Sequence, residues 1–178
     1  MSTDADFARP FTLAEAKRQA GCITLSADAE EREALARRFG LLALDALDAT
    51  LSLTVEGDEL HVAGHVTARA TQACIASGEP VPEKIDEAIA IRFVPSARLE
   101  AAEEEAEIEL DGASLDVIGY DGGAIDLGAM VADTLALALD PYPRSKDADA
   151  WLKAHGVKSE EEAGAFGALA ALKDKLTK

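Results

Sequence analysis

The sequence predicts an α+β fold, in which helices pack on a mostly antiparallel sheet and a helical tail follows at the C-terminus. Three observations support this prediction: a well-capped helical segment near the start, stretches whose apolar residues alternate with polar ones, and a later helix that ends at two prolines. The chain has 178 residues, so one domain with a tail is expected. We place that domain at residues 1–145, with a polar linker and short helix at 146–178.

The first quarter of the chain predicts short strands and one helix. Apolar residues on both sides of Pro10 indicate one or two short strands before residue 25. A helix is expected next, because Ser26 or Asp28 can cap it, acidic residues fill its first turn and basic residues its last. Gly40 ends this helix.

A period of two begins at Thr50 and indicates strands. Residues 50–56 alternate apolar and polar side chains, Gly57 and Asp58 form a turn, and residues 59–71 continue as a second strand. Gly64 is a candidate β-bulge that would reverse which face of this strand looks inward. A further strand is predicted at 84–94, after a loop at 72–82 that contains Gly and Pro.

The second half of the chain predicts an acidic arm, a strand and two helices. Residues 95–111 are expected to form the solvated arm, followed by a short apolar strand ending near residue 120. Asp126 is the N-cap candidate of a helix whose leucines form the core and which Pro141 and Pro143 terminate. The last residues predict a short helix with one apolar stripe and a lysine-rich end.

The charge balance narrows the class of partner. The chain has 34 acidic and 17 basic residues, a net charge of -17, which is unfavourable for general binding to bare RNA or DNA. A basic partner fits better, although acidic surfaces also serve solubility alone. Two cysteines, no apolar leader after a basic start and no long apolar run favour a reduced, cytoplasmic, soluble protein without a membrane segment.

The residue types that catalysis needs are sparse. His61 and His65 fall in a strand pattern, which holds them roughly 13 Å apart and disfavours a zinc site. Phosphate-binding glycine motifs, nucleophile elbows and zinc-protease motifs do not occur in the sequence. Cys74 alone cannot make a closed structural zinc site, and Ser77 stands three residues later. We therefore expect no enzyme activity, no metal and no cofactor.

Three segments resemble the YceD family of large ribosomal RNA subunit accumulation proteins. They are VTARATQACIASGEPVPEKI, GGAIDLGAMVADTLALALDPYPRS and FGALAALKDKL, and their order and spacing also fit the family. Family members commonly carry C-x-x-C in the first segment, whereas this chain has Cys74 and Ser77. The resemblance implies a non-enzymatic role in 23S rRNA accumulation and large-subunit biogenesis, often beside a gene for a small basic ribosomal protein.

Resemblance and charge together give a partner hypothesis. An acidic protein suits a basic large-subunit ribosomal protein or a 23S rRNA precursor particle, with the acidic arm steering association. A second version has RNA bound directly by a local basic patch of Arg69, Arg92, Arg144 and the terminal lysines. Eight aromatic residues offer little base stacking, and each arginine can instead cover apolar surface or pair with Glu. An adaptor unrelated to ribosomes is the alternative. The candidate partner-binding residues are Arg69, Cys74, Arg92, Glu103, Glu104, Glu105, Asp126 and Arg144.

Overall fold

The computed structural model describes residues 6–19, 21–99 and 116–157. The chain divides into two compact units, one made of Met1–Gln72 and Pro82–Asp140, the other of Ala73–Val81 and Pro141–Lys178. The domain boundary expected at residue 145 stays a prediction, and the expected C-terminal helix and most of the acidic arm lie outside the described residues.

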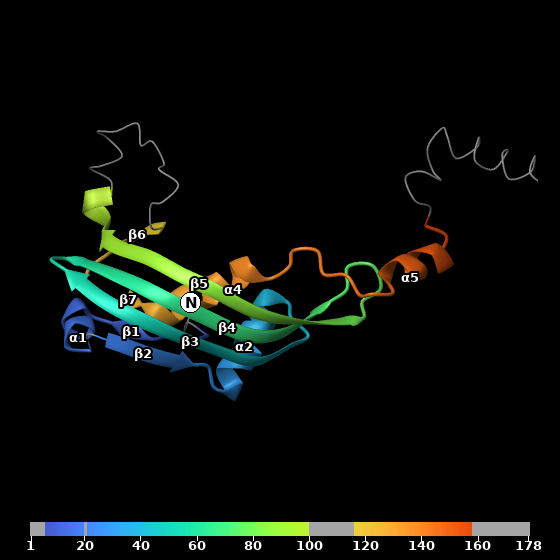
Figure 1. The fold of residues 1–178 in the computed structure, drawn as a ribbon, viewed down its shortest axis with the longest axis horizontal. Coiled ribbons are helices and arrows are strands. Elements are labelled where there is room, and N and C mark those ends of the chain that lie inside the picture. The colour runs from blue at the N-terminus through green and yellow to red at the C-terminus, as the bar shows by residue number, and fades with distance from the viewer. Residues whose placement is uncertain (1–5, 20, 100–115, 158–178) are drawn as a thin grey trace, which may run out of the picture. The chain divides into compact units, whose positions relative to one another are not determined.

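A five-stranded sheet organises the first unit (Figure 1). Its order is β2-β3-β4-β5-β6, with β2 and β3, and β3 and β4, antiparallel and β5 and β6 parallel. A two-stranded pair joins β1 to β7. The predicted α+β class with a mostly antiparallel sheet is therefore confirmed. The strands are β1 Pro10–Phe11, β2 Gly21–Ser26, β3 Ala43–Glu56, β4 Glu59–Ala73, β5 Pro80–Pro95, β6 Asp116–Tyr120 and β7 Ile125–Asp126.

Three of the described helices begin at side-chain caps, α1 Leu13–Arg18, α2 Ala29–Phe39 and α4 Leu127–Ala138 in the first unit, and α5 Ala148–Ala154 lies in the second. Residues 96–99, directly after β5, are also helical, which corrects the start of the predicted arm at residue 95. Helix α2 is confirmed: Asp28 caps it in a reciprocal capping box, and Gly40 ends it in the left-handed conformation. Helix α5 has no side-chain cap. The sequence patterns predicted neither α1 nor α5.

The β3–β4 hairpin confirms the predicted turn and corrects the predicted bulge. Gly57 has a φ of 65°, as a tight turn requires. Gly64 pairs in register with Leu51, and the inward and outward alternation continues through it, so Gly64 is not a bulge. A Cβ on Gly64 would collide with the carbonyl oxygen of Thr50, which explains the glycine as a site of close strand approach. The irregularity lies earlier, between Leu44 and Ala46 of β3.

The hydrophobic core lies on one face of this sheet. In β3 and β4 alternate side chains are buried, as for Leu51 and Leu53, while the intervening Ser52 and Thr54 are exposed. Helices α2 and α4 lie behind the sheet in the view of Figure 1 and contribute buried leucines, among them Leu35. Among the described residues, the members of this core carry no ionisable side chain.

Arg9 fastens the N-terminal segment to two helices. Its guanidinium donates to Glu31 Oε1 at 2.7 Å and Oε2 at 2.9 Å, and it lies 4.4 Å from the centre of the Phe7 ring. Its backbone N–H donates to Asp126 Oδ1, and its carbonyl accepts from the N–H of Leu127 at the start of α4. The Arg9–Glu31 ion pair therefore joins the segment that contacts α4 to helix α2.

Candidate functional site

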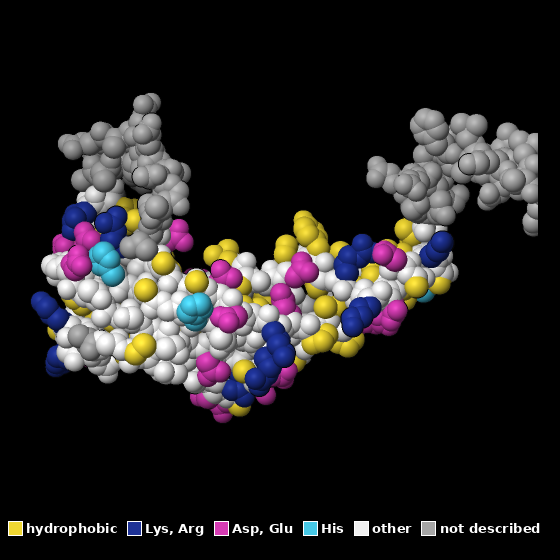
Figure 2. Space-filling view, in the orientation of Figure 1, with side chains coloured by type: hydrophobic (Ala, Val, Ile, Leu, Met, Phe, Trp, Pro, Cys, Tyr) yellow, Lys and Arg dark blue, Asp and Glu magenta, His cyan; other side chains and the backbone are white. Residues whose placement is uncertain are grey.

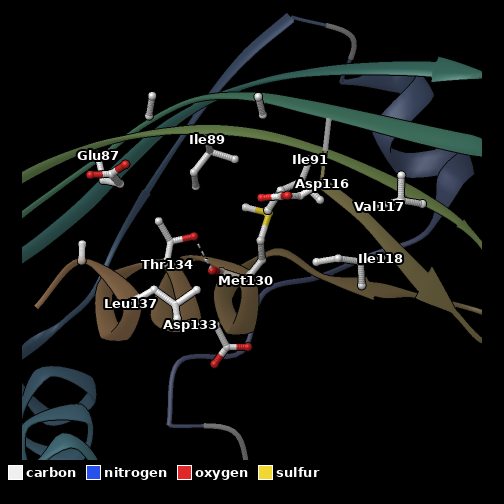
Figure 3. A pocket seen from close by; sticks show the side chains of 13 residues that line it. Glu87, Ile89, Ile91, Asp116, Val117, Ile118, Met130, Asp133, Thr134 and Leu137 are labelled. Atoms are coloured by element: carbon white, nitrogen blue, oxygen red, sulfur yellow. Dashed lines mark hydrogen bonds between the residues drawn. The ribbon is translucent and has the colours of Figure 1, made fainter. Parts of the chain in front are cut away.

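A groove of about 580 Å³ opens between β5, β6 and α4 in the first unit (Figure 3). Ile89 points from β5 toward the helix, and Met130 reaches from α4 toward the strands. Ile91 and Ile118 add further apolar side chains from the two parallel strands. The groove is thus mainly apolar, and its position between a sheet edge and a helix is typical of a peptide-binding surface.

Helix α4 presents one stripe of side chains to this groove. Met130, Thr134 and Leu137 follow the spacing of three to four residues that places side chains on one helix face. The Thr134 hydroxyl donates to the carbonyl of Met130 at 2.9 Å, so its polar atom is already satisfied by the helix. Leu137 is 89% exposed, which corrects the prediction that it belongs to the core.

Strand β6 is described from Asp116, directly after the undescribed residues 100–115. Its five residues pair in parallel with the last five residues of β5, beginning at Ile91 opposite Asp116. On its other edge β5 pairs with β4. Within the described residues no strand pairs with β5 before Ile91 on the β6 side.

Three carboxylates give the groove an acidic margin. Glu87 of β5, Asp116 of β6 and Asp133 of α4 line it, and neither Lys nor Arg is found among its described lining residues. Asp133 also lies 3.5 Å from Nη2 of Arg38, but both side chains are largely exposed and this pair is weak. The groove thus combines an apolar floor with negative charge.

A second, charged site lies where the β3–β4 turn meets the end of β5 and the start of the next segment. Glu59, whose side chain is only 14% exposed, accepts from Arg98 Nη2 at 2.8 Å. Arg92 Nη1 lies 3.8 Å and His61 Nε2 3.4 Å from the other Glu59 oxygen. Figure 2 shows basic, acidic and histidine side chains gathered at this end of the sheet. The acidic and basic side chains of this cluster pair with one another. The cluster therefore links the strands and leaves little unpaired charge for a binding partner.

Tyr120 adds a polar link to the same turn. Its hydroxyl donates to the carbonyl of Asp58 at 2.7 Å, and Arg98 Nη1 contacts the Asp58 carboxylate at 2.8 Å. Burial, and secondarily the Asp58 charge, raise the pKa of Tyr120 above its ordinary value. Tyr120 is therefore a hydrogen-bond donor at neutral pH, and it holds the end of β6 against the hairpin turn.

Arg69 and Arg92, the predicted patch residues of the first unit, lie far apart on the sheet. Arg92 lies near Glu59 at the start of β4, whereas Arg69 lies ten residues further along that strand, roughly 33 Å away by strand rise. Arg144, in the second unit, pairs with Asp149 at 2.6 Å. The distance between Arg69 and Arg92, and the ion pair of Arg144, both disfavour a shared basic surface for RNA.

Cys74 lies in the second unit, at the start of the turn between β4 and β5. It is buried, and the backbone N–H of Ser145 donates to its Sγ at 3.3 Å. This bond, followed by the Ser77 hydroxyl, lowers the pKa of Cys74 to about 6. Ser145 also donates to Glu79 Oε2 at 3.1 Å, so the turn holds the segment after Pro143 through several polar contacts.

The remaining predicted site residues divide between a cap and the undescribed region. Asp126 Oδ1 accepts from the N–H groups of Arg9, Gly128 and Ala129 at 2.8, 3.0 and 3.1 Å, the geometry of a structural N-cap. Glu103, Glu104 and Glu105 lie outside the described residues. In the part of the chain that is described, no three His, Cys, Asp or Glu side chains are placed to share a metal ion.

Sequence patterns overlooked the groove, although one signal pointed to it. Leu135 and Leu137 are two residues apart, and on a helix such positions face different directions. Leu135 is fully buried, so Leu137 has to look away from the core. The parallel pairing of β6 with β5 has no local sequence signature.

A protein-family model described as large ribosomal RNA subunit accumulation protein YceD matches residues 62–173, more than half of the chain. The match begins within β4 and includes every groove residue described above. No curated protein and no solved structure matches the chain. The described helices are all too short or too polar to cross a membrane.

Proposed function

Because this chain belongs to the YceD family of large ribosomal RNA subunit accumulation proteins, we propose that it supports 23S rRNA accumulation and large-subunit biogenesis without catalysing a reaction. It does so by binding a basic large-subunit ribosomal protein, free or within a precursor particle. The family match is the observation that carries the role in ribosome biogenesis. The work takes place in the cytoplasm, where ribosomal particles are assembled.

Charge supports a basic protein as the partner. The chain carries a net charge of -17, and complementary potentials speed association and select among partners. The groove beside β5 has an apolar floor and a margin of carboxylates, so its charge is negative like that of the whole chain. Direct RNA contact is less favoured, because Arg92 and Arg98 are engaged with Glu59, and Arg144 with Asp149. In this proposal the acidic residues 100–111 steer the partner toward the protein.

Depletion of the protein from cells tests this function. Cells are depleted, 23S and 16S rRNA are quantified separately, and subunits are resolved on sucrose gradients. The expected result is a selective loss of 23S rRNA and of large subunits, with 16S rRNA as the internal control. Normal yields of both rRNAs contradict the proposal. Rescue with a chain whose glutamates at 100, 103, 104, 105, 107 and 109 are replaced by glutamine tests the steering role, and full rescue argues against it.

A further inference from the structure

We propose that Asp58, Arg98 and Tyr120 form a clasp that fixes where the acidic residues 100–111 leave the sheet and return to it, at the end that carries the β3–β4 turn. Arg98 lies in residues 96–99, directly before the acidic residues, and Tyr120 ends β6, which follows them. This inference rests on the proposed function, in which those acidic residues steer a basic partner, and it assigns Arg98 and Tyr120 as positioning residues.

Asp58 bonds to the two flanks of the acidic residues through different atoms. Its carboxylate Oδ1 accepts from Arg98 Nη1 at 2.8 Å, and its backbone carbonyl accepts from the Tyr120 hydroxyl at 2.7 Å. The other terminal nitrogen of Arg98 lies 2.8 Å from Glu59 Oε1, so the guanidinium joins two neighbouring acids at the turn. Because one turn residue receives both bonds, release of either flank frees Asp58 to move and weakens the bond to the other flank.

The two flanks also pack against each other. A Cβ added to Gly119 of β6 would lie 3.0 Å from Ser96 Oγ, and Tyr120 is the register partner of Pro95, the last residue of β5. β6 as a whole pairs with the last five residues of β5. Figure 1 shows the helical turn after β5 and the β3–β4 turn at the same end of the sheet. The chain therefore leaves the described fold and re-enters it at this end.

The position of the acidic residues matters because charge acts over a short range in salt. At physiological ionic strength the field of an exposed charge is screened within about 8 Å. Acids held at one end of the sheet therefore attract a basic partner to that end, whereas the same acids spread over a wider volume attract it less strongly. The exposed Glu56 and Asp121, each within two residues of a clasp residue in the sequence, add charge of the same sign.

Hydrogen exchange of the full chain tests whether the clasp exists. Tyr120→Phe removes only the hydroxyl, and Arg98→Lys keeps the charge but loses the fork that reaches two carboxylates. Each variant should speed amide exchange about threefold in both flanks, 96–99 and 116–120, because loss of one bond weakens the other. Unchanged exchange, or faster exchange confined to the flank that carries the substitution, overturns the clasp.

A double-mutant cycle measures the same coupling through stability. Wild type, the two single variants and the Arg98→Lys/Tyr120→Phe variant are unfolded in urea. The double variant should raise the unfolding equilibrium constant about threefold less than the product of the two single effects. Arg98→Lys combined with Arg9→Met, a site outside the clasp, is the control, and its two effects should multiply. Effects that simply multiply in the clasp pair as well contradict coupling through Asp58.

Rescue of depleted cells tests the positioning role. Cells depleted of the protein receive the Arg98→Lys/Tyr120→Phe variant at the wild-type protein level, and 23S rRNA is quantified against 16S rRNA. The net charge of this variant equals that of wild type, so a difference in rescue reports where the charge is held and not how much there is. We expect a partial recovery of 23S rRNA, below the recovery that wild type gives.

Arg9→Met is the matched control for stability, because it removes an ion pair outside the clasp, and it should restore 23S rRNA fully. Full recovery with the clasp variant, or an equal shortfall with Arg9→Met, overturns the positioning role. Should the double variant fail to accumulate, Tyr120→Phe alone is used and the same outcomes apply. Normal 23S rRNA in the depleted cells contradicts the proposed function instead, and hydrogen exchange still decides whether the clasp exists.

Discussion

The Arg9–Glu31 ion pair gives a quantitative test of how the N-terminal segment is held. We consider Arg9→Met, Glu31→Gln and the double variant as a double-mutant cycle. Glutamine keeps an oxygen that can accept the backbone N–H of Asp28, so the cap of α2 is retained. Methionine keeps the length of the arginine stem and its packing beside Phe7. The cycle therefore isolates the charged contact.

The expected coupling energy follows from the geometry and exposure of the pair. Two hydrogen bonds of 2.7 and 2.9 Å join the guanidinium to both carboxylate oxygens. Exposed pairs contribute about 0.2–1 kcal/mol, and well-sheltered charged hydrogen bonds about 1.5–3 kcal/mol. The side chains are 31% and 20% exposed, between these cases, so a coupling of about 1.5 kcal/mol is expected. Breaking the pair should lower Tm by roughly 3–6 °C.

The pH dependence has a definite sign. The hydrogen bonds from Arg9 hold the pKa of Glu31 below its ordinary value of 4.5. A group with a lowered folded pKa adds stability above its unfolded pKa and loses it as the pH falls through the folded pKa. The difference in free energy of unfolding between wild type and Glu31→Gln should therefore be constant from pH 7 to about 5, and shrink below 4.5. Urea unfolding at several pH values measures it. A coupling below about 0.5 kcal/mol at pH 7 refutes the assignment.

Three further predictions concern close packing, the helix cap and the buried thiol. Gly128→Ala should destabilise the protein by about 2 kcal/mol or more in urea unfolding, because the added Cβ would collide with the carbonyl oxygen of Phe7. The control is Gly123→Ala, which has open space around its Cβ position. Equal destabilisation by both variants would contradict the close packing at Gly128. Asp126→Ala should cost about 1–2 kcal/mol and leave binding of the ribosomal partner unchanged, whereas lost binding with intact stability would indicate a contact role. The difference in thiolate absorbance near 240 nm between wild type and Cys74→Ala should titrate with a midpoint of about 6. The free energy of unfolding of wild type, relative to this variant, should rise between pH 6 and 9. A midpoint near 8.5 would contradict the bond from Ser145.

Local sequence signals predicted the parts of the fold that local chemistry determines. Helix α2 has its cap, first-turn acids, last-turn bases and terminal glycine between Asp28 and Gly40, so its position was predicted closely. The β3–β4 hairpin has its turn glycine between two alternating segments. Helix α1 was missed because its capping box, Thr12 with Glu15, starts only six helical residues, too few for a visible apolar period.

Strand lengths and the groove depend on contacts that the sequence does not display. Strand β3 begins at Ala43, seven residues before the alternation became visible, because the irregularity near Ala46 puts buried Leu44 and Leu47 three residues apart. That spacing breaks a period of two. The groove requires β6 to pair in parallel with the far part of β5 and α4 to lie beside both, a tertiary arrangement. Most of the predicted binding residues were chosen for charge, and Arg92, Asp126 and Arg144 are engaged in structural contacts.

The absence of ionisable side chains from the described core of the first unit has a practical consequence for work on the partner. Mild acidification alters the charge on the outside of that unit and leaves its core side chains uncharged. Buffer pH and ionic strength then become independent controls in a binding assay. A loss of complex on going from pH 7 to pH 5 in such an assay would report the titration of groups outside this core, on either protein.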